Sequence, residues 1–353
     1  MNFDAFVKDI TDNKWNVFGT EVYVDGVLKH SWGDTSGLHD IYSATKSVLS
    51  IAFGILYDEG KIDPDRPFVE YLPEGASYSE KYKEVTVRRL LTMDVPGLPF
   101  RAEGDNWLEY SLNCDIDLDV VTFNYSNINS FLIGVCLTNI LGSDLGAFIE
   151  ERIFKPLDIS SYEYGRSPEG YFYGASGMRL SVHDLSKFGL LMLNKGVYNG
   201  VRIVSEEYVE MATSIQKMNR EGGYGFFFWK YRGGFSINGK CKQKCYVLPK
   251  QGLVITYLSY IDDDSHDLVE SAEKNIIGTD KDAEARIAAM EKLYDLALTK
   301  EATSDEIKTL EEYYTGADWK HDLALDETGL LPANLKRGVL SEDGLYDLLE
   351  DMI

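Results

Sequence analysis

The chain has 353 residues, 44% of them hydrophobic, and a formal net charge of −23 at pH 7. This length is more than one hydrophobic core usually serves, so we expect one large domain and one small domain. The negative charge argues against nucleic acid and anionic membranes as partners, because phosphates repel such a surface. No apolar run approaches the ~20 residues that a membrane span needs, and the N-terminus does not resemble a secretory signal.

The N-terminal part predicts a β-hairpin followed by a buried helix. Two β-rich runs flank Asp25 and Gly26, and an Asp-Gly pair favours a tight hairpin turn because both residues must adopt positive φ. The segment after Ser43 carries apolar residues at helical spacing, and Gly60 is a suitable stop signal.

The middle of the chain is predicted to be helical, and strands follow it. Helices are expected within residues 85–98 and 181–196, and residues 117–142 are expected to form a loop and then a buried helix that ends at Gly142. Residues 223–259 indicate consecutive antiparallel strands with turns near 233–234 and 250–252. Because strands bracket a helical middle, we expect an α/β fold of the α+β type, in which one antiparallel sheet is flanked by helices.

The composition changes near Asp262. From Ile261 to the end, 25 residues are acidic and 9 are basic, a net charge of −16, whereas the first 260 residues carry −7. Two segments after residue 280 have helical spacing, and the last part contains Trp319 and several leucines, which make it too apolar for a solvated tail. The sequence therefore predicts a domain at residues 1–265 and a small helical domain at residues 280–353.

Three tetrapeptides have the pattern Ser-x-x-Lys: Ser43–Lys46, Ser214–Lys217 and Ser271–Lys274. Only the first opens a strongly apolar helix, where one helical turn puts the lysine beside the serine hydroxyl. A free lysine has a pKa of ~10.4, so it must be partly buried to act as a base near neutrality. We therefore take Ser43 and Lys46 as the candidate nucleophile and base. The alternative is a helix-capping serine beside a solvated lysine.

Two further segments could complete a site. The segment Tyr125-Ser126-Asn127 is the only Tyr-x-Asn in the chain. A tyrosine can relay a proton, and an asparagine can hold an amide or a carbonyl. Residues 239–243, expected on a strand, contain Lys240, a cation that could help to hold the other groups in reactive protonation states. The alternatives are a turn tyrosine, an asparagine that caps a helix and a surface lysine.

Other kinds of site find little support. Residues 234–240 spell the G-x-x-x-x-G-K skeleton of a phosphate-binding loop, but Cys241 follows in place of serine or threonine. The five histidines fall at no metal-ligand spacing, so we expect no metal and no other cofactor. The four cysteines are scattered, which predicts reduced thiols in a cytoplasmic protein.

Residues 15–260 resemble the serine hydrolase family that contains class C β-lactamases, penicillin-binding proteins, esterases and D-aminopeptidases. The resemblance rests on these segments, in the order of the family: SATKS, VTVRRLLTMDVPGL, FNYSNINSFLIG, RIFKPLDISSYEYG, GASGMRLSVHDLSKFGLLMLNKGVYNGVRIVS and YVLPKQGLVITYLS. It implies a β-lactamase/transpeptidase-like sheet flanked by helices. It also implies Ser43 as nucleophile, Lys46 as its base, Tyr125 as the tyrosine partner and Asn127 as a substrate ligand.

The same resemblance places Lys240 at the lysine or histidine of the third family motif, Lys-Thr-Gly or His-x-Gly. The backbone N–H groups of Ser43 and Gln243 would then form the oxyanion hole. Lys242 replaces the usual glycine of the motif, and alternation along a strand would put it on the same face as Lys240. Trp107 lies in a segment that we expect to line the substrate site.

The expected activity is hydrolysis of a small ester or amide through an acyl-enzyme on Ser43, with weak or no β-lactamase activity. The alternatives are a weak β-lactamase or penicillin-binding-type enzyme, and a catalytically impaired binding or interaction protein. Residues 280–353 resemble DUF4298, a bacterial domain of unknown function. Its acidic surface could bind a protein partner.

Overall fold

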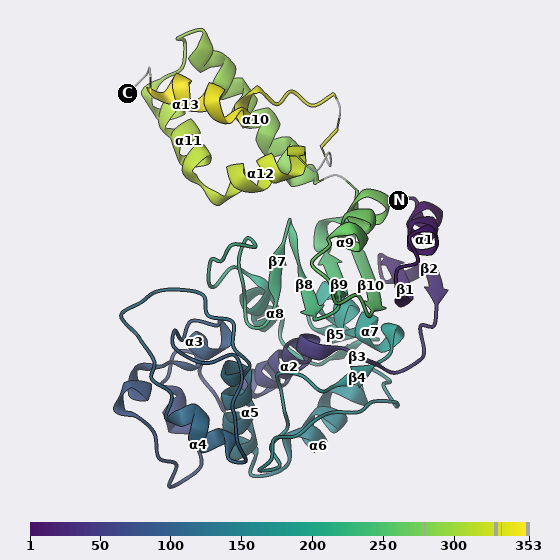
Figure 1. Cartoon of the computed structure of the whole chain (residues 1–353), viewed down its shortest axis with the longest axis vertical. Helices are drawn as coiled ribbons and strands as arrows, with labels where there is room; N and C mark the ends of the chain where they lie inside the picture. Colours follow the sequence, from purple (N-terminus) through teal and green to yellow (C-terminus); the bar gives the residue numbers. More distant parts are fainter. Residues whose placement is uncertain (279, 328–330, 333, 351–353) are drawn as a thin grey trace. The chain divides into compact units, whose positions relative to one another are not determined.

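The computed structural model describes residues 1–278, 280–327, 331–332 and 334–350. The chain divides into two compact units (Figure 1). We call Lys14–Asp264 the sheet unit, and Met1–Asn13 together with Ser265–Ile353 the helical unit.

A six-stranded sheet with the order β2-β1-β10-β9-β8-β7 lies at the centre of the sheet unit. All neighbouring strands are antiparallel. The strands are β1 (Val17–Val24), β2 (Val27–Gly33), β7 (Trp229–Tyr231), β8 (Gly234–Gly239), β9 (Gln243–Leu248) and β10 (Leu253–Ser259). The first strand pairs with the last one, which confirms the predicted sheet built from both ends of the domain. Two short pairs add β3 (His39–Asp40) with β4 (Arg179–Leu180), and β5 (Val197–Tyr198) with β6 (Val201–Arg202).

The predicted N-terminal hairpin is confirmed. β1 and β2 are joined by Asp25 and Gly26, whose φ angles are 51° and 77°. Positive φ at both central residues matches the twist of the two strands. Aspartate and glycine tolerate this conformation better than most other residues.

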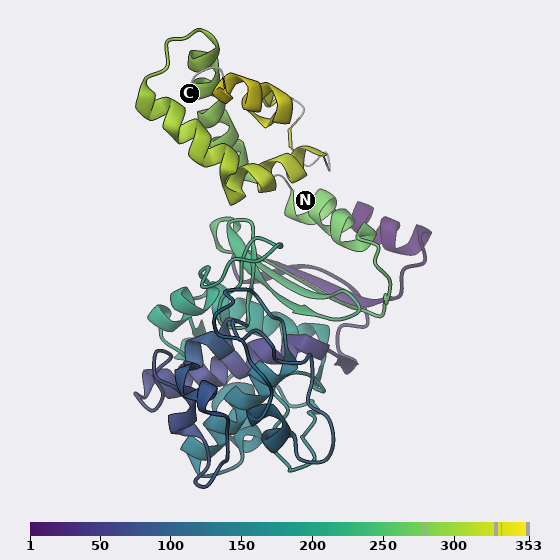
Figure 2. The same cartoon turned by 60° about the vertical axis from the view of Figure 1, so that its left-hand side comes forward.

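Helix α2 (Thr45–Asp58) begins two residues after Ser43 and runs through the core. Every residue from Thr45 to Leu56 is buried. The helix is tied to a distant segment by two serines: Ser47 Oγ donates to Phe227 O at 2.7 Å, and Ser50 Oγ donates to Phe226 O at 2.6 Å. One hydrophobic core joins α2 to the sheet, and Figure 2 shows the strands along one side of the helices.

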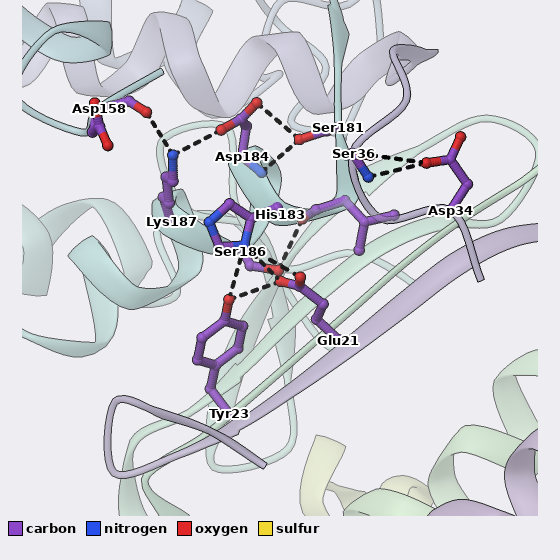
Figure 3. Close-up of polar contacts among 11 residues, drawn as sticks. Glu21, Tyr23, Asp34, Ser36, Asp158, Ser181, His183, Asp184, Ser186 and Lys187 are labelled. Atoms are coloured by element: carbon purple, nitrogen blue, oxygen red, sulfur yellow. Dashed lines mark hydrogen bonds and ion pairs between the residues drawn. The ribbon is translucent and has the colours of Figure 1, made fainter. Parts of the chain in front are cut away.

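Helix α7 (Val182–Leu193) packs closely on the sheet. A Cβ atom at Gly189 would lie 2.6 Å from Cys245 Sγ, so glycine permits this close approach. At the start of the helix, His183 Nδ1 lies 3.2 Å from the buried Glu21 carboxylate, which also accepts a hydrogen bond from Tyr23 Oη at 2.7 Å (Figure 3). Ser181 caps the helix, because its Oγ accepts from Asp184 N at 2.9 Å.

The remaining helices of the sheet unit include the predicted buried helix α5. They are α3 (Val87–Leu91), α4 (Trp107–Leu112), α5 (Asn127–Leu141), α6 (Leu145–Ile149) and α8 (Glu206–Thr213). The helix expected within residues 85–98 is short, because Met93 has a φ of 59° that a right-handed helix cannot contain. In the part of the chain that the structure describes, no single helix is long and apolar enough to cross a membrane. Only α5 and Leu145–Phe154, taken together across an 83° bend, pass on length and composition.

The helical unit contains α1 (Phe3–Asp12), α9 (Asp267–Ala272), α10 (Lys281–Leu298), α11 (Ser304–Thr315), α12 (Ala317–Glu327) and α13 (Glu342–Glu350). Asp9 of α1 accepts hydrogen bonds from Ser271 and Asn275. Among the described residues between 283 and 349, buried side chains form a hydrophobic core of their own, which includes Ile287, Leu310, Trp319, Val339 and Leu345.

Candidate active site

Ser43 lies in the short helix η1 (Tyr42–Ala44), immediately before α2. The preceding residue, Tyr42, has a φ of 47°, an uncommon value for a residue other than glycine. The end of β8 lies against this segment, since a Cβ atom at Gly239 would stand 2.2 Å from Ile41 O. The serine is therefore held at a sharp turn between the sheet and the N-terminus of a buried helix.

Lys46 is 1% exposed, and its ammonium nitrogen has three hydrogen-bond acceptors. Nζ lies 3.1 Å from Ser43 Oγ, 2.7 Å from Asn127 Oδ1 and 2.9 Å from Ala175 O. All three acceptors are uncharged. Burial without a neighbouring carboxylate disfavours the ammonium form and lowers the pKa of Lys46 to about 7.

Tyr125 borders the same amine. Lys46 Nζ lies 5.0 Å from the centroid of its ring. Burial raises the pKa of Tyr125 to about 12, and a hydrogen bond with Ser43 opposes this shift. The tyrosine is therefore a neutral phenol near pH 7, next to the serine hydroxyl and to the lysine amine.

The backbone around Tyr125 and Asn127 is fixed by the start of α5. Ser126 caps the helix, with its Oγ accepting from Ile128 N at 3.1 Å and donating to Pro99 O at 2.5 Å. Asn127 N–H donates to Phe100 O at 2.7 Å. These bonds hold both side chains against Lys46.

The other two Ser-x-x-Lys tetrapeptides have different partners. Ser214 Oγ donates to Met211 O at 2.9 Å, and Lys217 forms an ion pair with Asp94 at 2.7 Å. Ser271 Oγ donates to the Asp9 carboxylate at 2.6 Å. Of the three, the structure places the serine hydroxyl against the lysine amine in Ser43–Lys46, where the amine lacks an anionic partner.

Residues 240–242 form a turn, so the expected strand through this segment is wrong. Cys241 and Lys242 have φ angles of 59° and 64°, and Gln243 N–H donates to Lys240 O at 3.4 Å. Two successive positive φ angles define a type I′ turn, which joins β8 to β9. The argument that alternation places Lys240 and Lys242 on one face of a strand therefore fails.

Both lysines of this turn are directed to other groups. Lys240 Nζ lies 3.0 Å from Asp262 Oδ2, and its side chain is 63% exposed. Lys242 Nζ donates to Asp263 O at 2.9 Å. The structure thus does not bring them to Lys46 in the way that the third-motif assignment expected.

Gln243 is buried at the start of β9 and links two strands. Its Nε2 donates to Ser259 O at 2.6 Å, and its Oε1 accepts from Ser259 N at 2.9 Å. Its backbone N–H, expected in an oxyanion hole, makes the long bond to Lys240 O within the turn.

Trp107 packs beside a residue that the sequence analysis did not single out. Its ring centroid lies 5.0 Å from that of Tyr173, and its Nε1 donates to Gly104 O at 3.0 Å. Burial raises the pKa of Tyr173, whereas a hydrogen bond with Asn127 and the charge of Arg101 act in the opposite direction. Tyr173 and the carbonyl of Ala175 thus belong to the same cluster as Lys46.

Metal binding finds no support in the described part of the chain, where no three or more His, Cys, Asp or Glu side chains are grouped suitably. The chemistry that the site offers is proton transfer. A serine hydroxyl lies within reach of an amine that is partly neutral near pH 7, as nucleophilic catalysis requires.

The chain is similar to known proteins over both of its parts. The family model described as Beta-lactamase matches residues 22–275, and the model of DUF4298, a domain of unknown function, matches residues 279–352. A 6-aminohexanoate-dimer hydrolase from Paenarthrobacter ureafaciens is 26% identical over 259 residues. The match covers 63% of this chain and 66% of that relative, just under two thirds of its length.

Solved structures share the fold. A putative 6-aminohexanoate-dimer hydrolase from Bacillus anthracis has a TM-score of 0.64 at 18% identity, covering 77% of this chain and 80% of the other. A family VIII carboxylesterase has a TM-score of 0.59 at 17% identity, covering 78% and 96%. The predicted β-lactamase/transpeptidase-like fold is thereby confirmed. The chain belongs to the β-lactamase family of serine hydrolases.

Proposed function

We propose that this protein hydrolyses a small ester or amide through an acyl-enzyme on Ser43. The observation that carries the proposal is the Lys46 amine, which is buried against the Ser43 hydroxyl with three uncharged hydrogen-bond partners. An amine with a pKa of about 7 can accept a proton at neutral pH, whereas an ordinary lysine cannot.

The reaction has two stages. Ser43 Oγ attacks the substrate carbonyl, its proton passes to the unit formed by Lys46 and Tyr125, and a tetrahedral oxyanion forms. The oxyanion collapses to an ester on Ser43, and the leaving alcohol or amine takes the proton. Water then attacks the acyl-enzyme, giving up a proton to the same unit, and Ser43 is released with its hydroxyl restored.

The oxyanion needs N–H donors, each typically worth ~3–4 kcal/mol. We assign one donor to the backbone of Ser43. Gln243 N–H remains the candidate for the second, because its bond to Lys240 O is long at 3.4 Å. A bond of that length is weak, so exchanging it for an oxyanion costs little.

Similar proteins support the choice of ester or amide. One relative is named as the hydrolase of an aminohexanoate dimer, and one solved neighbour as a carboxylesterase. We further propose that the protein works in the cytoplasm, since Cys114, Cys136, Cys241 and Cys245 are all free thiols.

The test is labelling with a fluorophosphonate probe, followed by intact-mass analysis. We expect one adduct on the wild-type protein, none on Ser43→Ala, and one on the matched control Ser214→Ala. The wild-type protein and Ser214→Ala should hydrolyse p-nitrophenyl acetate, and Ser43→Ala should not. A folded wild-type protein that neither labels nor turns over the ester would contradict the proposal, as would an adduct that persists in Ser43→Ala.

A further inference from the structure

Two aromatic clusters adjoin the candidate site, one at Lys46 and one at Asn127. The first, which we call the Tyr125 cluster, consists of Phe123, Tyr125, Tyr224 and Trp229. The rings of Tyr125 and Trp229 lie 5.5 Å apart, and those of Tyr224 and Trp229 lie 4.9 Å apart. This cluster reaches Ser43 through the hydrogen bond of Tyr125.

The second, which we call the Tyr173 cluster, consists of Trp107, Phe131, Tyr171 and Tyr173. Trp107 lies 5.0 Å from Tyr173 and 5.9 Å from Phe131, both in edge-to-face geometry. The cluster meets the site at Asn127, which hydrogen bonds both to Tyr173 and to Lys46. The indole N–H of Trp107 is bonded to Gly104 O, so this side chain offers mainly apolar surface.

The charges near the nucleophile do not favour an anion on the β8–β9 side. The turn carries two lysines, but Lys240 is paired with Asp262 and Lys242 is bonded to Asp263 O. This turn adjoins the residue before Ser43, since Cys241 hydrogen bonds to Tyr42. Glu221 adds a negative charge close enough to act on Tyr125. The Glu221 carboxylate would repel an anionic substrate group that lay near Tyr125.

Resting on the proposed function, we propose a substrate class: an uncharged ester or amide whose acyl group is aromatic or alkyl and carries no carboxylate. The aromatic rings of the two clusters can stabilise an apolar acyl group by burial and by ring stacking. Both lysines of the β8–β9 turn are held by other groups, Lys240 by the Asp262 carboxylate and Lys242 by the Asp263 carbonyl, which disfavours an anchor for a substrate carboxylate at this turn. Arg101, whose charge acts on Tyr173 in the other cluster, is a position where an anion could be held, and the test includes it.

The experiment compares p-nitrophenyl esters that share a leaving group. We expect kcat/KM for the neutral pentanoate to exceed that for the matched anionic hydrogen succinate by about tenfold or more. The phenylacetate should exceed the acetate by a similar factor. Trp107→Ala and Trp229→Ala should lower kcat/KM for the phenylacetate more than for the acetate, which indicates a role in binding the acyl group.

Asp262→Asn tests the charge argument directly, because it frees Lys240. It should raise kcat/KM for the succinate several-fold without a comparable change for the pentanoate. The matched control Glu151→Gln frees Lys155, whose ion pair lies in residues 150–155, and should change neither substrate.

Two results would overturn the inference. One is a wild-type preference for the succinate, above all one that Arg101→Gln abolishes. The other is an equal loss of kcat/KM for the phenylacetate and the acetate in both Trp107→Ala and Trp229→Ala. In either case, fluorophosphonate labelling of Ser43 would show that the proposed function stands and that only the substrate class is wrong. Absence of both labelling and turnover would count against the proposed function itself.

Discussion

Lys46 in the sheet unit and Arg286 in the helical unit both carry a basic group among buried side chains, and their partners differ. Arg286 Nε lies 2.9 Å from the carboxylate of Asp322, which is fully buried and also accepts from Tyr313 Oη at 2.9 Å. Lys46 has an amide oxygen, a hydroxyl and a backbone carbonyl instead. One cation is compensated by a charge, and the other only by dipoles.

The difference separates a structural ion pair from a reactive amine. A buried pair keeps both groups charged, and removing one partner costs several kcal/mol. A buried amine with neutral partners loses its proton more easily, because desolvation disfavours the charged form. Burial thus lowers the pKa of Lys46 to about 7, at the expense of stability, so that a neutral amine is available as a base near pH 7. Arg286, in contrast, cannot deprotonate and serves the fold.

The largest expected effect comes from removing the uncompensated amine. Lys46→Ala and Tyr125→Phe should each lower kcat/KM for an activated ester by about 10²- to 10⁴-fold, the usual contribution of a proton-transfer group. Because the two act on the same proton, the double variant should lose much less than the product of the single losses. Steady-state kinetics on folded protein measure this. Losses that multiply in the double variant would argue against a shared relay. The control is Lys217→Ala, which removes a lysine that is paired with Asp94.

A second change would make Lys46 resemble a paired cation. Asn127→Asp puts a carboxylate at the position of an oxygen now 2.7 Å from Nζ, and a close opposite charge raises the pKa of an amine by 1–3 units. In the wild type, kcat/KM should rise as pH increases through about 7, where Lys46 loses its proton. In Asn127→Asp this rise should move to higher pH, with activity at pH 7 reduced about tenfold per unit.

The control for this prediction is Asn127→Ala, which removes the amide without adding a charge. It should lower activity, because Asn127 is also the proposed substrate ligand, but it should leave the rise in the pH profile near 7. A profile that stays in place in Asn127→Asp would mean that Lys46 does not set the pH dependence.

A third prediction concerns stability. The pKa of Lys46 is about 7 in the folded protein and ~10.4 in an unfolded chain. Between these values only the unfolded chain binds the proton, so this residue makes the free energy of unfolding rise with pH by up to ~1.4 kcal/mol per unit. Urea unfolding at pH 6, 8 and 9.5 should show this rise in the wild type relative to Lys46→Met, which cannot titrate. A constant difference between the two proteins would be incompatible with a neutral Lys46.

Local patterns in the sequence predicted the parts of the site that one helix supplies. Ser43 and Lys46 are one turn apart at the start of an apolar helix, so their contact follows from helix geometry. Asn127 was marked by its Tyr-x-Asn segment, and the Asp25-Gly26 hairpin by its turn residues. In each case, a few neighbouring residues determine the local geometry.

The β8–β9 turn shows where such patterns fail. Cys241 and Lys242 adopt positive φ, although neither is a glycine, asparagine or aspartate, the residues that usually indicate such a turn in a sequence. The Asp262 carboxylate, which pairs with Lys240, and the Asp263 carbonyl, which accepts from Lys242, come about twenty residues later in the chain. The hydrogen bond from Lys46 to the Ala175 carbonyl could not be predicted from the sequence either. Every residue has a backbone oxygen, and only the fold determines which one lies next to Lys46.

The smallest expected effect on activity comes from breaking the compensated pair. Asp322→Ala leaves Arg286 and the Tyr313 hydroxyl without their acceptor, which should destabilise the core of residues 283–349 by about 3–5 kcal/mol. Asp318→Ala is the matched control, since this carboxylate is 68% exposed and 3.8 Å from the same arginine; an exposed pair contributes ~1 kcal/mol or less. If residues 280–353 are an independent domain that acylation does not require, kcat/KM should be unchanged in both variants. Hydrogen exchange would report the loosening of residues 283–349, and loss of turnover in parallel with it would show that the C-terminal helices help to form the site.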